Sequence, residues 1–304
     1  MRIASLNGII SFMNESYILY INMGSNISVF NSYSALKSIN DCFPHSKIHF
    51  IFPDYLFSII SKWDFIDTFI PTEVNAGFFE KWSLFSKLKS YKYDFIFLID
   101  NFSGEFFIKK YLNFKKFISS KNTDELLSSS FNDNGLIFRK YEPLISYPEG
   151  FSYRVGKIKP PLLTIIPFSE YTDLEWPIDK FLYIASAYNN ITGGNIVIAG
   201  DNRTYERSRA FLVYNFVYNI TENASPLDVS FVAKHSNAVL CSPSIFSHIA
   251  SAVNKNVICV SDSDCSRFDF PASARKKFSR ERDAVNRDFS EEEVLEAVIN
   301  KSSE

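Results

Sequence analysis

The most informative hydrophobic pattern in the chain lies between Asn237 and Val260. Two short apolar runs, at residues 238–241 and 257–260, enclose the polar residues 242–244 and a stretch with apolar positions at helical spacing. Apolar runs of this length are typical of buried parallel strands, and a serine–proline–serine break offers a helix N-cap. The pattern predicts strand, turn, helix and strand, with the turn at the strand's carboxyl end, where open α/β sheets bind ligands. An ordinary strand–helix–strand unit without a ligand is the alternative interpretation.

The first half of the chain repeats this alternation. Gly24 lies in the turn after the first strand, but no lysine of the Walker type follows, so the turn alone is a weak phosphate signal. Strands separated by helices predict a parallel, doubly wound sheet. The apolar runs that predict these strands are residues 17–22, 47–52, 66–70, 93–99 and 116–118.

A second alternation follows a stiff segment, Lys159-Pro160-Pro161, which is the best domain boundary in the sequence. Its first strands are predicted at residues 162–166, 195–199 and 217–220, ahead of the unit described first. Residues after 260 look irregular and basic, and Ser290 caps a predicted terminal helix, Glu291 to Ile299. The fold class predicted is therefore α/β, with two Rossmann-like doubly wound domains, residues 1–157 and 162–304, facing a central cleft. We expect that the terminal helix can pack back on the first domain.

Composition narrows the class of protein. With 304 residues, 46% hydrophobic residues and a net charge of −2, the chain is globular and is not a general nucleic-acid binder. Its four cysteines lack the spacing of a metal site, so no metal is expected, and they look like buried small residues in a reducing compartment. No apolar run approaches the ~20 residues of a spanning helix, and the bacterial cytoplasm is the expected location.

Four segments, in this order, resemble glycosyltransferase family 9, the heptosyltransferases of lipopolysaccharide synthesis. The opening strand, turn and helix carry the first likeness, and Tyr93-Asp94 with its apolar strand carries the second. The third joins the helix start at Trp176-Pro177 to the loop from Gly200 to Glu206, and the fourth is the stretch from Ala238 to His248. The resemblance implies the two-domain GT-B fold, with an N-terminal acceptor domain and a C-terminal nucleotide-sugar donor domain. It implies a nucleotide sugar as substrate and no separate cofactor.

The chain differs from the family at the positions of the catalytic acid and the phosphate-binding lysine. The catalytic acid of the family corresponds to Ser28, and its phosphate-binding lysine corresponds to Leu174. An inverting sugar transfer needs a base, and neither Ser28 nor Asn26 in the first turn is one near neutral pH. Asp100, at the end of the fourth predicted strand, is the substitute carboxylate, with an ordinary solvated loop acid as the alternative.

For the donor, the resemblance and the strand-end turns select five residues. Ser169, Ser242 and Ser244 offer hydroxyls, and the amides at residues 244–246 suit a phosphate. Glu206 is expected to accept from ribose hydroxyls, or else to be a charge on a solvated helix face. His248 is expected to donate to a phosphate or orient the loop, or else to be a buried structural histidine. Arg203 and Arg207 either replace the charge of the missing lysine or are solvated.

Three hypotheses for function follow. The favoured one is a glycosyltransferase acting on a lipopolysaccharide or cell-surface polysaccharide acceptor, a glycan or lipid-linked glycan. The alternatives are a catalytically silent GT-B domain that binds a sugar or supports a partner, and a polysaccharide pyruvyl transferase-like enzyme. Membrane contact is expected to be peripheral at most, at the inner face of the inner membrane. The candidate anchor is the basic cluster Arg275, Lys276, Lys277, Arg280 and Arg282. A solvated loop is the favoured interpretation of this cluster, because Glu281 and Asp283 interrupt it.

Overall fold

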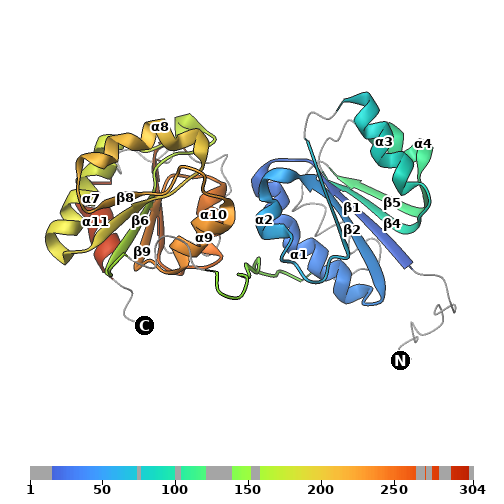
Figure 1. Ribbon diagram of the computed structural model, residues 1–304, viewed down its shortest axis with the longest axis horizontal. Coiled ribbons are helices and arrows are strands. Elements are labelled where there is room, and N and C mark those ends of the chain that lie inside the picture. Colours follow the sequence, from blue (N-terminus) through green and yellow to red (C-terminus); the bar gives the residue numbers. More distant parts are fainter. Residues whose placement is uncertain are drawn as a thin grey trace. The chain divides into compact units, whose positions relative to one another are not determined.

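The structure of the protein is a computed structural model, and it describes residues 16–73, 77–99, 104–120, 139–151, 158–264, 271, 276–280 and 289–300. The chain divides into two compact units, shown in Figure 1. The first holds residues 1–57 and 64–142, and the second holds residues 58–63 and 143–304. Each unit contains one parallel β-sheet with helices, so the predicted α/β class with two Rossmann-like sheets is confirmed.

The first unit is built around a five-stranded sheet in the order β3-β2-β1-β4-β5. All neighbouring strands run parallel. In chain order the elements up to residue 120 are β1 (Ser16–Asn22), α1 (Asn26–Cys42), β2 (Ser46–Pro53), η1 (Asp54–Leu56), α2 (Phe57–Ile60), β3 (Thr68–Thr72), α3 (Phe78–Leu88), β4 (Lys92–Ile99), α4 (Glu105–Tyr111) and β5 (Asn113–Ser120), of which α2 after Phe57 groups with the second unit.

Alternating side chains of β1 pack on opposite faces of this sheet, as the period of a strand requires. Leu19 and Ile21 join a core with Phe85 of α3 and Phe107 of α4. On the other face the hydroxyl of Tyr20 donates to the Ser32 hydroxyl of α1 over 3.3 Å. In Figure 1, α1 lies on one side of the sheet and α3 and α4 lie together on the other.

The chain passes from the first unit to the second between Glu142 and Pro143, ahead of the proline pair at which the sequence predicts a linker. Aromatic packing explains why residues after 143 group with the second unit. The Tyr147 ring lies 5.4 Å from that of Phe231, and its hydroxyl is 3.1 Å from the Ser230 hydroxyl.

The second unit is built around a six-stranded parallel sheet in the order β11-β10-β9-β6-β7-β8. In chain order the elements are β6 (Leu162–Ile166), η4 (Thr172–Leu174), α7 (Ile178–Thr192), β7 (Asn195–Ile198), η5 (Asn202–Thr204), α8 (Tyr205–Ser208), η6 (Arg209–Val213), β8 (Val217–Asn219), α9 (Pro226–Lys234), β9 (Ala238–Cys241), α10 (Ile245–Ser251), β10 (Val257–Asp264), β11 (Lys276–Arg280) and α11 (Glu291–Ile299).

Helices cover both faces of this sheet, as a fully parallel sheet requires. Figure 1 shows α7 and α11 on one side and α9 and α10 on the other. The core on the α7 side includes Phe181 of α7, Leu240 of β9 and Val294 of α11. The terminal helix thus packs within the second unit, and Ser290 caps it with the predicted box, since its hydroxyl accepts from the Glu293 amide over 3.2 Å.

One strand was not predicted. The sequence predicts an irregular chain after Val260, whereas β10 extends to Asp264 and β11 pairs with it in parallel at the edge of the sheet. Charged residues interrupt β11, as in Lys276, Lys277 and Arg280. Such residues are common on edge strands, because only one side of an edge strand is paired, and they remove the continuous apolar signal of a central strand.

Candidate functional site

The second sheet reverses its strand order between β6 and β9. These neighbouring strands run parallel, with β7 and β8 beyond β6 on one side and β10 and β11 beyond β9 on the other. The chain leaves β6 and β9 at their carboxyl ends, so the loop after Ile166 and the loop after Cys241 begin side by side. This point of reversal is where doubly wound sheets bind ligands.

Serine hydroxyls connect the two loops. Ser242, which is fully buried, donates to the carbonyl of Pro167 over 2.8 Å and accepts from the amide of Trp176 over 3.3 Å. Ser169 donates in the opposite direction, to the carbonyl of Pro243. The spacing of the loops is therefore set by hydrogen bonds, and the hydroxyl of Ser242 is engaged in a structural role.

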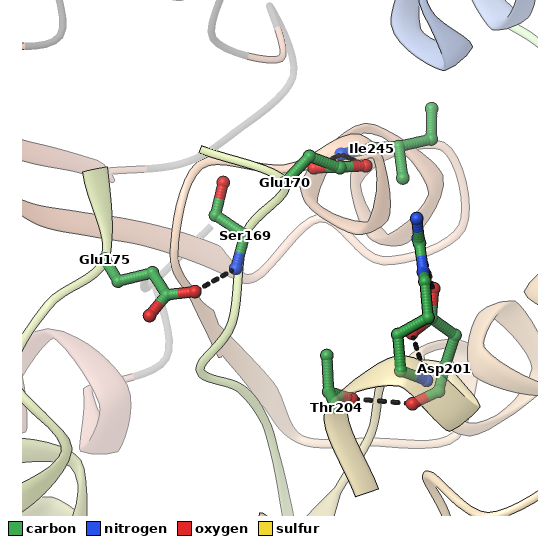
Figure 2. A network of polar contacts seen from close by, with 7 residues as sticks. Ser169, Glu170, Glu175, Asp201, Thr204 and Ile245 are labelled. Carbon is green, nitrogen blue, oxygen red and sulfur yellow. Dashed lines mark hydrogen bonds and ion pairs between the residues drawn. The ribbon is translucent and has the colours of Figure 1, made fainter. Parts of the chain in front are cut away.

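Glu170 lies against the start of α10, as Figure 2 shows. Both of its carboxylate oxygens are 3.3 Å from the backbone nitrogen of Ile245, the first residue of that helix. First-turn amides have no partner within the helix, so the carboxylate takes a position suited to an anion. The pKa of the Glu170 carboxyl is raised above its ordinary value, chiefly because protein surrounds the carboxylate, although the residue as a whole is exposed.

Glu175 supports the loop from the opposite side. Its carboxylate accepts from the amide of Ser169 over 2.9 Å and pairs with the guanidinium of Arg207, whose Nη1 donates to Oε1 over 3.0 Å. The Arg207 guanidinium also lies 4.3 Å from the centre of the Phe168 ring. The hydrogen bond that Arg207 donates to Glu175 is the main reason that the pKa of Arg207 is raised. Because Glu175 already balances its charge, Arg207 is a weak substitute for the phosphate-binding lysine that the family resemblance leads one to expect.

A third strand end adds a buried carboxylate. Asp201 follows β7, and its side chain is only 8% exposed. It accepts from the Arg203 amide over 3.0 Å and from Arg203 Nε over 2.8 Å, while the Thr204 hydroxyl donates to its backbone carbonyl over 2.7 Å. Figure 2 shows Asp201 and Glu170 at the same rim of the sheet. The charges of Arg203 and Asp201 both act on the pKa of Glu170, in opposite directions.

The remaining donor residues predicted from the sequence lie in different surroundings. The side chain of Glu206 is 76% exposed and forms an ion pair with Arg209 at 3.1 Å. Ser244 and His248 are buried at the first turn of α10. Within the described residues the hydroxyl of Ser244 has no hydrogen-bond partner, which is unusual for a buried polar atom. The structure thus brings Ser169, Ser242, Ser244 and His248 to the β6–β9 rim and leaves Glu206 on a solvated helix face.

The turn after β1 contains the predicted residues of the first unit. The Asn22 amide nitrogen donates to the Ser28 hydroxyl over 3.2 Å and to the Ser32 hydroxyl over 2.7 Å, and its amide oxygen accepts from the Gly24 amide over 3.0 Å. Ser25 caps α1, since its hydroxyl accepts from the Ser28 amide. Asn26 begins that helix. Asn22 and the capping serine therefore hold the turn in place, a role that the sequence analysis did not assign.

Two other predictions fall partly or wholly outside the described residues. Asp100 is not described, so its role stays a prediction. Of the basic cluster, Lys276, Lys277 and Arg280 lie on β11, and Arg275 and Arg282 are not described.

The described ranges contain no cluster suited to a metal ion and no helix suited to cross a membrane. No group of three or more His, Cys, Asp or Glu residues there is placed to hold a metal ion. The helices found in these ranges are too short or too polar to cross a membrane.

Two parallel sheets with reversed strand order, and loops gathered at the carboxyl ends of the strands, define a two-domain Rossmann-like α/β protein. No model of a known protein family matches the sequence, and no curated protein matches it. Solved structures do match. The glycosyl transferase family 9 protein from Veillonella parvula superposes with a TM-score of 0.73 at 14% identity, over 94% of this chain and 97% of its own.

Two Escherichia coli enzymes have the same fold. ADP-heptose LPS heptosyltransferase II superposes with a TM-score of 0.71 at 16% identity, over 93% of this chain and 97% of its own. Heptosyltransferase WaaC, solved with ADP, superposes with a TM-score of 0.62 at 14% identity, over 87% of this chain and 93% of its own. The resemblance to family 9 and its GT-B fold, stated from sequence motifs, is thus confirmed at the level of the fold.

Proposed function

We propose that the protein is a glycosyltransferase that takes a sugar from a nucleotide-sugar donor held by the second unit. The observation that carries this proposal is the pair of loops at the β6–β9 reversal, linked through Ser242 and Ser169 and presenting the buried Ser244 hydroxyl beside the start of α10. Support comes from the shared fold of the family 9 structures, of which WaaC was solved with ADP.

In this proposal the diphosphate of the donor lies at the β6–β9 rim. The Ser244 hydroxyl and the first amides of α10 donate to its oxygens, and His248 orients or contacts the same group. The carboxylate of Glu170 is bonded to the Ile245 amide and must move aside or take up a proton when a phosphate arrives. Glu206 or the more buried Asp201 accepts from the ribose hydroxyls. Donor binding is therefore proposed to replace the Glu170 carboxylate at the Ile245 amide by the diphosphate of the donor.

The acceptor is proposed to be a glycan or lipid-linked glycan bound by the first unit. Its hydroxyl oxygen attacks the anomeric carbon of the donor, the bond to the phosphate oxygen breaks, and the nucleoside diphosphate leaves with the electron pair. A base must take the hydroxyl proton, and Asp100 is the carboxylate proposed for this role. The attack on the face opposite the leaving group makes the transfer inverting.

A silent binding domain is the second candidate, and one observation favours it. The hydroxyl of Ser28, at the position of the family's catalytic acid, accepts from the Asn22 amide and forms part of the hydrogen bonding that fixes the turn. A residue used in this way supports the fold and takes no proton from a substrate.

The two candidates are separated by a nucleotide-sugar panel assayed for binding and for turnover. Ligand-induced stabilisation identifies the nucleotide, because a ligand that binds only the folded state raises apparent stability by mass action. Release of nucleoside diphosphate in the presence of a glycan acceptor then supports the transferase. Binding of the same nucleotide sugar without transfer or hydrolysis supports the silent domain.

A further inference from the structure

Four large aromatic side chains on α3 and α4 of the first unit are exposed. Phe79 is 80% exposed, Phe78 and Phe106 are each 63% exposed, and Trp82 is 47% exposed. Phe78 and Phe79 begin α3, and Trp82 follows them by four and three residues, so its side chain neighbours both on the helix surface. Figure 1 shows that α3 and α4 lie side by side, and rings connect them, since Phe78 is 5.1 Å from Phe107 of α4. We call these four residues, Phe78, Phe79, Trp82 and Phe106, the aromatic patch.

This patch is not needed to complete the hydrophobic core. The same helices bury other aromatic residues, Phe85 of α3 and Phe107 of α4, against the sheet. Exposing four large aromatic side chains to water on neighbouring helices is unfavourable, and such clusters mark surfaces that bind something. The patch therefore indicates an interaction surface.

The charge around the patch is positive. Residues 77–120 contain eight lysines and four acidic residues, whereas the whole chain has a net charge of −2. Lys110 lies over the ring of Phe106 at 5.3 Å, and Lys109 lies over the ring of Phe117 at 5.1 Å. In both contacts the ammonium group itself lies beside the ring, and that of Lys109 also pairs with Glu105. Lysines beside exposed aromatic rings are typical of surfaces that bind at the boundary between lipid tails and anionic head groups.

The position of the patch suits an enzyme that works on a lipid-linked acceptor. All strands of the first sheet are parallel, so their carboxyl ends lie at one edge. α3 follows β3 and α4 follows β4, so the first turns that carry Phe78, Phe79 and Phe106 lie toward the edge where Asn22 and Gly24 form the turn after β1. A surface that docks there would bring that turn close to the bilayer.

We propose that the aromatic patch docks the protein onto an anionic phospholipid surface. The aromatic rings enter the head-group layer and the surrounding lysines meet the lipid phosphates. This docking is peripheral and independent of nucleotide binding by the second unit. It assigns membrane contact to α3 and α4 of the first unit, in place of the basic cluster at residues 275–282.

The test is flotation of the whole protein with vesicles of phosphatidylethanolamine and phosphatidylglycerol, with phosphatidylcholine vesicles in parallel. Wild type is expected to float with the anionic vesicles and to be released by salt. The double substitution Phe79→Ser with Phe106→Ser is expected to reduce partitioning by about tenfold or more, since each buried aromatic ring contributes to interfacial binding. The matched control is Leu212→Ser with Val213→Ser, which removes exposed apolar side chains, 49% and 74% exposed, from the second unit.

Each remaining outcome contradicts the proposal. Wild type that floats with no vesicle, or a patch variant that floats as well as wild type, overturns it. Loss of flotation on neutralising the basic cluster alone assigns the anchor to β11 and its neighbours. Concentration-dependent self-association in sedimentation, abolished by the patch variant without any flotation of wild type, assigns the surface to a second copy of the chain. A cooperative thermal unfolding transition of the patch variant at the wild-type temperature, measured without ligand, shows that the variant is folded and keeps this test separate from that of the transferase.

Discussion

The carboxylate of Glu170 accepts from the backbone amide of Ile245, with both oxygens 3.3 Å from the nitrogen. The contact joins the loop after β6 to the start of the helix after β9, at the reversal of strand order. It places the negative charge of the Glu170 side chain where the negatively charged diphosphate of the proposed donor would bind. The proposed function therefore makes Glu170 a competitor of the ligand.

The first prediction is that Glu170→Gln tightens binding of a nucleoside diphosphate. Removing one charge near a phosphate is expected to raise affinity roughly five- to tenfold at neutral pH. The pKa of Glu170 is raised, so in wild type the affinity should fall as pH rises from the ordinary glutamate value through the raised one. Calorimetry across this range checks both statements. Asp173→Asn, an exposed acid in the same loop, is the control, and matching pH profiles for wild type and Glu170→Gln would contradict the prediction.

The same raised pKa has a consequence for stability. A carboxyl that holds its proton more tightly in the folded state favours folding at low pH, and this contribution is lost as pH rises through the folded-state pKa. The free energy of unfolding of wild type, relative to Glu170→Gln, is therefore expected to decrease over that window. Urea titrations at several pH values measure the difference, and a relative increase would mean that the Ile245 hydrogen bond outweighs the burial of the charge.

The second prediction separates two neighbouring serines. Ser242→Ala leaves the Pro167 carbonyl and the Trp176 amide without their partner, so a loss of about 1–3 kcal/mol of unfolding free energy is expected. Ser244→Ala removes a buried hydroxyl that has no partner within the described residues, so stability should stay within about 0.5 kcal/mol of wild type. Denaturant unfolding measures both. Equal losses for the two variants would show that Ser242 has no special role in joining the loops.

The third prediction concerns the ribose. Glu206→Ala is expected to weaken nucleotide binding by about 1–3 kcal/mol if its carboxylate accepts from a ribose hydroxyl. Arg209→Ala breaks the same surface ion pair and leaves the carboxylate in place, so it serves as the matched control. Asp201→Asn tests the more buried acid at the end of β7. A loss of affinity confined to Asp201→Asn would move the ribose from Glu206 to Asp201.

The fourth prediction concerns the base. Asp100→Asn should lower turnover by a factor on the order of 10²–10⁴ while donor binding is retained, the usual span for a general base. Asp54→Asn is the control, because Asp54 is exposed and follows β2 at the same edge of the sheet. Ser28→Asp should restore or raise activity by returning a carboxylate to the family position. Unchanged turnover for Asp100→Asn would exclude it as the base.

Much of the fold follows from local pattern. The β9–α10–β10 unit and the terminal helix were predicted because apolar runs, serine caps and acidic first turns each act over a few residues. β9 at Ala238–Cys241 and α11 at Glu291–Ile299 have the predicted limits. β11 was missed because lysines on an edge strand interrupt the apolar run on which strand prediction depends.

The site was less predictable because its contacts join distant residues. Glu170 and Ile245 are 75 positions apart, and Glu175 and Arg207 are 32 apart. No spacing rule links such pairs, since only the strand order brings their loops together. A usable signal was present in the acids close after predicted strands, Glu170 after β6 and Asp201 after β7. The sequence proposes Ser242 and Ser244 alike as donor residues, and both are buried, so only the hydrogen bonds of the structure distinguish the linking Ser242 from Ser244.

The central claim is that the β6–β9 rim binds the diphosphate of a nucleotide sugar, and calorimetric titration with nucleoside diphosphates tests it most directly. The account predicts saturable binding of at least one nucleoside diphosphate to wild type. It also predicts weaker binding to Ser244→Ala at unchanged unfolding free energy, and tighter binding to Glu170→Gln. Absence of binding by every nucleoside diphosphate and nucleotide sugar tried, or binding that neither substitution alters, would contradict it.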